Sequence, residues 1–113
     1  MKILLDENLP HALRAELAEY DVFTVSYLGW KGVRNGNLLR KAAEFGFDAL
    51  ATQDWGMQYE QNVANLPLSI IVMQAKSNDM EDLGPLVPEL KAALASVEPR
   101  TLTRVGLPKP PGN

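Results

Sequence analysis

The sequence contains no cysteine and only one histidine, His11, among its 113 residues. Without cysteine the chain cannot form a disulfide, a thiol nucleophile or a cysteine-ligated zinc or iron–sulfur site. A single histidine also excludes multi-histidine metal centres. Any divalent metal would therefore be held mainly by oxygen ligands, which favours Mg²⁺ or Mn²⁺.

An excess of positive charge and long hydrophobic runs are also missing. The chain has 11 Lys and Arg against 14 Asp and Glu, a net charge of −3, so contacts with nucleic acid would need a local basic patch. No apolar run approaches the ~20 residues that span a bilayer. The first residues turn acidic at Asp6, unlike a secretory signal. We therefore expect a cytoplasmic protein with no membrane contact.

The hydrophobic pattern predicts a single α/β domain over residues 1–106. Short runs rich in apolar and β-branched residues predict five strands, at 2–5, 21–26, 48–52, 68–73 and 100–105. Amphipathic segments predict the helices between them, at 9–17, 38–45, 55–65 and 79–97. Asn8 is expected to cap the first of these helices. We expect a three-layer, Rossmann-like sandwich with right-handed crossovers and a mainly parallel sheet of order 2-1-3-4-5. Residues 107–113 contain three prolines and are expected to be a disordered tail.

Two acidic residues follow neighbouring strands of this predicted sheet. Asp6 ends the first strand and Asp54 follows the third, so both would lie at the crevice where such sheets bind ligands. A single acid at a strand end more often caps a helix or stays solvated. Two carboxylates in one crevice stay ionised only if a cation or hydrogen-bond donors bridge them. The pair therefore predicts a site for Mg²⁺, which also contacts substrate phosphates.

Three segments resemble a known family: Met1–Pro10, the glycine-rich loop before Leu38, and Thr52-Gln53-Asp54. They are similar to the PIN-like family known as domain of unknown function 5615, related to the C-terminal nuclease-like domain of Mut7. The resemblance covers roughly residues 1–105. It implies a PIN-like fold and a ribonuclease dependent on Mg²⁺ or Mn²⁺. It also implies the role of toxin in a toxin–antitoxin pair, with an RNA substrate and a cognate antitoxin as partners.

The family's acidic positions carry over only in part. Asp6, with Glu7 beside it, matches the first acid, and Asp54 matches the acid after the third strand. Asn35 and Gly56 stand where the family usually has two further acids. Asn35 could ligate a metal through its amide oxygen, but without charge. The resemblance therefore implies either a ribonuclease with weakened activity or a catalytically inactive PIN-like binding module.

Four further interpretations stay open. Glu7 and Glu60 are candidates to replace a missing acid in catalysis. His11 is either a surface residue or a proton-transfer group. The acids after strands 1 and 3 also match a phosphoacceptor receiver, although Met73-Gln74-Ala75 lacks the hydroxyl that a receiver needs after strand 4. The apolar residues of the last helix and the tail could form a homodimer interface.

The chain has one concentration of basic residues, around the loop before residue 38. Lys31, Arg34 and Arg40, with Lys41, surround Trp30. Cations that contact phosphates and an aromatic ring that stacks on a base are typical of proteins that bind single-stranded RNA. The alternative is a solvated helix face with Trp30 buried against the sheet, which we favour for Lys41.

Overall fold

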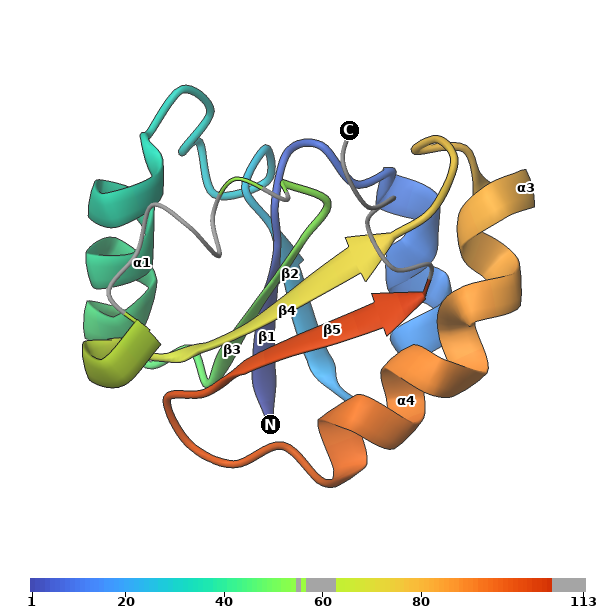
Figure 1. Cartoon of the computed structure of the whole chain (residues 1–113). Coiled ribbons are helices and arrows are strands. Elements are labelled where there is room, and N and C mark those ends of the chain that lie inside the picture. Colours follow the sequence, from blue (N-terminus) through green and yellow to red (C-terminus); the bar gives the residue numbers. More distant parts are fainter. Residues whose placement is uncertain (55, 57–62, 107–113) are drawn as a thin grey trace.

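The computed structural model describes residues 1–54, 56 and 63–106 (Figure 1). They form a five-stranded sheet of order β2-β1-β3-β4-β5, in which every neighbouring pair is parallel. The strands are β1 (Lys2–Leu5), β2 (Asp21–Thr24), β3 (Ala49–Thr52), β4 (Ser69–Gln74) and β5 (Leu102–Gly106). The predicted α/β class, strand positions and strand order are confirmed.

Helical segments connect the strands. They are η1 (His11–Leu17), α1 (Asn35–Glu44), η2 (Val63–Asn65), α3 (Met80–Leu83), η3 (Gly84–Leu86) and α4 (Val87–Ala95), where η marks a 3₁₀ helix. Most of the helix predicted at 55–65, and the tail at 107–113, lie outside the described residues. Within the described ranges, every helix is too short or too polar to cross a bilayer.

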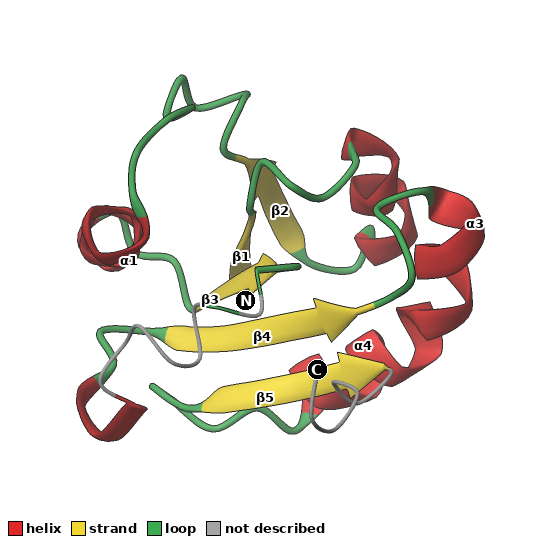
Figure 2. Cartoon of the chain, turned by 45° about the horizontal axis from the view of Figure 1, so that its top comes forward, coloured by secondary structure: helices red, strands yellow, loops and turns green. Residues whose placement is uncertain are grey.

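The sheet lies between two helical layers, as Figure 2 shows. Successive residues of β4 point to opposite faces: Ile70 and Val72 pack against α1, whereas Ile71 and Met73 pack against η1, α3 and α4. All four side chains are fully buried. Burial on both faces explains why the central strands β1, β3 and β4 read as continuous apolar runs instead of alternating ones.

The connection from β4 to β5 corrects the prediction that all crossovers are right-handed. The β1–η1–β2 connection moves toward one edge of the sheet and β4–α3–α4–β5 moves toward the other, yet both pack on the same face. They therefore have opposite hands, and in Figure 1 the β4–β5 connection is the left-handed one. This long connection is broken at Gly84–Leu86. It is therefore less constrained by strand twist than a crossover made of one helix.

The segment after β1 also differs from prediction. The amphipathic pattern predicted an α-helix capped by Asn8, but η1 is a 3₁₀ helix preceded by Pro10, with no side-chain cap. Its first turn closes through a hydrogen bond from Leu13 N to Pro10 O, three residues apart. Asn8 is used elsewhere, as the site described next shows.

Candidate metal-binding site at the carboxyl edge of the sheet

A buried threonine hydroxyl joins the two predicted acids. Thr52, the last residue of β3, donates from Oγ1 to Asp6 Oδ2 at 2.7 Å. The same oxygen accepts the backbone N–H of Asp54 at 3.0 Å and the side-chain amide of Asn8 at 3.1 Å. Asp6 and Asp54 thus belong to one hydrogen-bonded cluster, as the predicted strand order requires.

Asn8 completes this cluster by tying the loop after β1 to the loop after β3. Its Oδ1 accepts the backbone N–H of Gln53 at 3.0 Å, while its Nδ2 donates to Thr52. The sequence pattern predicted a capping role for Asn8 and no role for Thr52. The available signal was a hydroxyl residue that ends a buried strand immediately before the polar pair Gln53-Asp54.

Asp6 is the buried member of the acid pair, with 7% of its surface exposed. Burial raises its pKa above the ordinary value, and the charges of Glu7 and Asp54 act in the same direction. Hydrogen bonds from Thr52 and from the backbone N–H of Glu7, at 2.8 Å to Oδ1, act in the opposite direction. A bound cation would favour the ionised form of this carboxylate.

Asp54 is half-buried, and both of its oxygens accept hydrogen bonds. The Asn35 Nδ2 amide, at the start of α1, donates to Oδ2 at 3.1 Å, and the backbone N–H of Gly56 donates to Oδ1 at 2.9 Å. The two positions where the family usually has acids are thus occupied by groups that orient Asp54. Asn35 directs its amide nitrogen toward the Asp54 carboxylate, and a metal-ligating role for its amide oxygen stays a prediction.

The donor set is compatible with a hard divalent cation held by two carboxylates. Each carboxylate oxygen offers about two lone-pair positions, so the hydrogen bonds to Asp6 and Asp54 leave room for a metal. Mg²⁺ commonly binds through one or two carboxylates and keeps several waters. Within residues 1–54, 56 and 63–106, no three acidic or imidazole side chains group as metal ligands. Glu60, a candidate third acid, lies outside these residues.

Glu7 and His11 lie beside the pair. Glu7 is exposed, and its Oε1 accepts the backbone N–H of Gly32 at 3.4 Å, which brings the loop after β2 over this edge. His11, Asp6 and Glu7 line a small cavity of about 50 Å³. Larger cavities, of about 490 and 390 Å³, lie away from Asp6 and Asp54.

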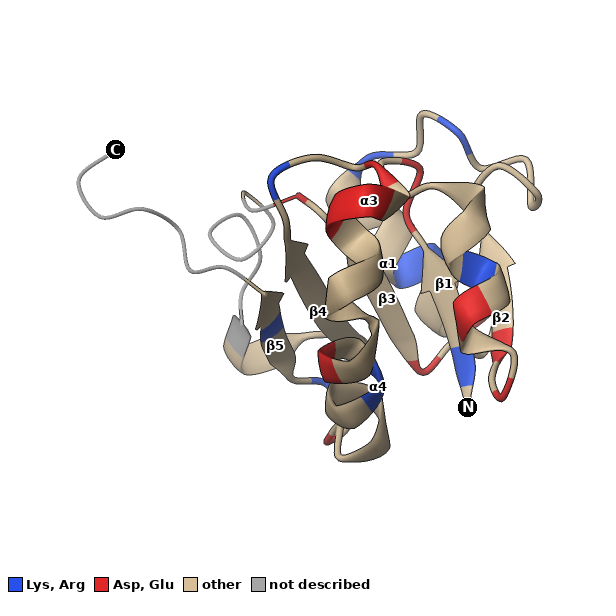
Figure 3. Cartoon of the chain, turned by 90° about the vertical axis from the view of Figure 1, so that its right-hand side faces the viewer, with Lys and Arg blue, Asp and Glu red and all other residues tan. Residues whose placement is uncertain are grey.

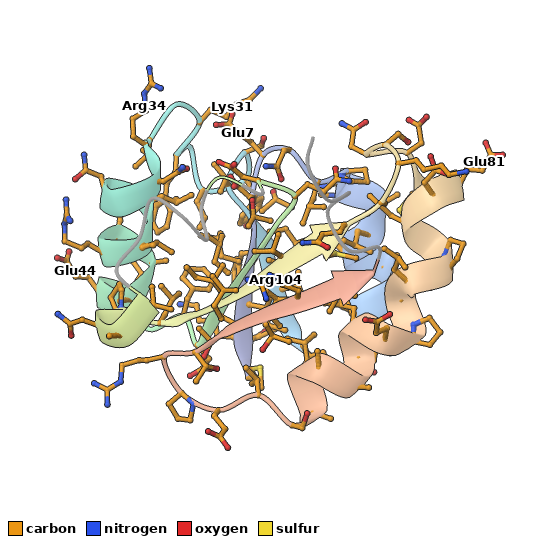
Figure 4. All side chains as sticks on the ribbon, in the orientation of Figure 1. Glu7, Lys31, Arg34, Glu44, Glu81 and Arg104 are labelled. Carbon is orange, nitrogen blue, oxygen red and sulfur yellow. The ribbon has the colours of Figure 1, made fainter. Side chains whose placement is uncertain are left out.

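The predicted basic patch divides into exposed and packed residues. Lys31 and Arg34 are exposed near Glu7 (Figure 4). Arg40 hydrogen-bonds to Asn37 on α1. Trp30 is 8% exposed and belongs to the core. Because its ring is buried, Trp30 cannot stack on a base. The alternative prediction, that Trp30 is buried in the core, is the correct one.

Trp30 is covered by its neighbours on the α1 side. The rings of Phe45 and Phe47 pack edge-on against it, with centroids at 4.9 and 6.2 Å. The Lys41 ammonium lies 5.2 Å from its ring centroid. Lys41 therefore packs on an aromatic ring and is not one of the cations at the carboxyl edge.

Comparisons with protein-family models, curated proteins and solved structures found no match for this chain. The resemblance to the PIN-like family thus rests on the three sequence segments described above.

Proposed function

We propose that this chain is a PIN-like ribonuclease that uses Mg²⁺ or Mn²⁺ and serves as the toxin of a toxin–antitoxin pair. One observation carries the nuclease part of the proposal. The Asp6 carboxylate and the backbone N–H of Asp54 share the buried hydroxyl of Thr52. This hydroxyl lies at the carboxyl edge of a parallel sheet, the place where this architecture binds ligands. The toxin role, the antitoxin partner and the cytoplasmic location rest on the resemblance and the composition.

Asp6 and Asp54 would hold the ion. When bound, a divalent ion polarises a phosphate oxygen, activates a water molecule and offsets the negative charge of the transition state. Thr52 orients Asp6, and Asn35 orients Asp54, so that both carboxylates are positioned before a ligand arrives. Preorganised groups of this kind avoid the cost of reorganisation during reaction.

A second candidate is a catalytically inactive PIN-like binding module. It is favoured by the surroundings of Asp54, where Asn35 and Gly56 replace two expected acids and donate to both carboxylate oxygens. Hydrogen bonds replace part of the stabilisation that a metal would otherwise supply to this carboxylate. Such a module would bind RNA, an antitoxin or a second copy of the chain without cleaving RNA.

Cleavage of single-stranded RNA in Mn²⁺ separates the two candidates. The wild-type chain should cleave RNA, and Asp6→Asn should lower the rate at least tenfold while the protein stays folded. Asp21→Asn is a matched control because Asp21 is an exposed acid at the opposite, amino end of β2. Metal-dependent cleavage that is unchanged in Asp6→Asn would remove Asp6 from the reaction. RNA binding without cleavage would favour the inactive module.

A further inference from the structure

The connection between β4 and α3 is fixed beside the acid pair. Gln53, which precedes Asp54, donates from Nε2 to the backbone oxygen of Ser77 at 2.8 Å. Ser77 in turn donates its hydroxyl to Asp82 Oδ2 at 2.7 Å and accepts the backbone N–H of Asp79 at 3.0 Å. These bonds hold the backbone next to residue 76 close to the end of β3. A side chain from this connection can therefore reach the carboxyl edge.

Lys76 is the cation on this connection. It is exposed, and its side chain forms no ion pair or hydrogen bond within the described part of the chain. The same holds for Lys31 and Arg34, on the loop before α1. By contrast, Lys91 on α4 pairs with Glu19 at 3.3 Å. The cations at the carboxyl edge are thus available for an anion, whereas a lysine elsewhere on the surface is partnered.

These cations lie on two sides of the acid pair. Lys31 and Arg34 precede α1, which packs on one face of the sheet, and Lys76 precedes α3, which packs on the other. In Figure 3 the loops along the upper edge carry basic segments, next to the acidic start of α3. Asp79, Glu81 and Asp82 provide that negative charge. A polyanion would therefore be attracted as far as Lys76 and repelled beyond it.

We propose that Lys76 contacts a phosphate of a single-stranded RNA that crosses the carboxyl edge from Lys31 and Arg34. The inference deepens the proposed function, because it takes RNA as the ligand of this edge. Cations on both sides of two carboxylates suit a flexible strand with phosphates at regular intervals. Lys76 is thus a binding residue, separate from the groups proposed to hold the metal.

The test measures binding without catalysis. A fluorescent single-stranded RNA is titrated with protein in EDTA at several salt concentrations. Lys76→Ala should weaken binding about fivefold, equivalent to about 1 kcal/mol, and lower the slope of log K against log salt by about 0.7, the value for one phosphate on a single strand. Lys76→Arg should restore both values. Lys91→Ala is the matched control and should change neither.

The outcomes distinguish this inference from the proposed nuclease. An unchanged salt slope in Lys76→Ala overturns the role of Lys76, whatever the chain does to RNA. Preference for duplex RNA, or binding of an acidic peptide but not RNA, also overturns it. If the wild-type chain does not cleave RNA in Mn²⁺, but Lys76→Ala lowers the salt slope as predicted, the proposed nuclease is refuted and the RNA contact of Lys76 is established.

Discussion

Replacing Thr52 by valine removes the hydroxyl that joins Asp6 and Asp54 while keeping the shape of the side chain. Thr52 is fully buried, so water cannot take the place of the lost oxygen. The substitution leaves Asp6 Oδ2, the Asn8 amide and the Asp54 N–H without their common partner. An unpaired polar group that stays buried carries its full desolvation cost.

The expected loss follows from the three bonds. The bond to the Asp6 carboxylate contributes about 2 kcal/mol, since bonds to charged groups contribute about 1.5–3. The hydrogen bonds from Asn8 and Asp54 contribute less. Both residues are half-buried, so their N–H groups can bind water once the hydroxyl is removed. Together the loss in free energy of unfolding should be about 3 kcal/mol at neutral pH.

Urea denaturation of Thr52→Val measures this loss, and Thr52→Ser is its control. Serine keeps the hydroxyl and removes one methyl group, which should cost about 1 kcal/mol. A valine variant that loses no more than the serine variant would refute the view that Thr52 Oγ1 organises the site. Metal affinity should fall with stability in the valine variant and be retained in the serine variant.

Three other changes test neighbouring parts of the account. Burial raises the pKa of Asp6, so the folded chain binds a proton more tightly there than the unfolded chain does. The free energy of unfolding of the wild type, relative to that of Asp6→Asn, should therefore be greatest below the ordinary carboxyl pKa. It should decline as pH rises through the raised pKa, and urea unfolding across acid to neutral pH measures it. Gln74→Leu should raise stability by about 1 kcal/mol, because the buried Nε2 of Gln74 lacks a partner among the described residues; a lower Tm would contradict this. Gly106→Ala should lower stability by about 3 kcal/mol, since Gly106 has φ +98° and a Cβ there would overlap the Gln74 carbonyl; an unchanged Tm would contradict it.

The three central strands were predictable because each is a short apolar run buried on both faces, as Ser69–Gln74 illustrates. The edge strand Leu102–Gly106 is only partly buried and was predicted from alternating apolar and polar residues. The sequence also placed Asp6 and Asp54 at one edge, since strand order and strand ends follow from the alternation of elements. The start of α1 was placed three residues late, because Asn35, Gly36 and Asn37 carry no helix signal. No side-chain cap marks this start.

Other features depend on tertiary contacts that no local pattern records. The 3₁₀ form of η1 and the left-handed β4–β5 connection depend on how helices share one face of the sheet. Trp30 was placed beside the basic residues by sequence proximity, but Phe45 and Phe47 enclose its ring in the fold. The central position of the Thr52 hydroxyl depends on the pairing of β1 with β3, which brings Thr52 beside Asp6. The local sequence around Thr52 does not record this pairing.

The most direct test of the central claim is a crystal structure with Mn²⁺, with the ion located by its anomalous scattering. One Mn²⁺ should bind carboxylate oxygens of both Asp6 and Asp54, with the Thr52 hydroxyl still bonded to Asp6. An ion bound elsewhere, or two carboxylates too far apart to share one, would contradict the central claim.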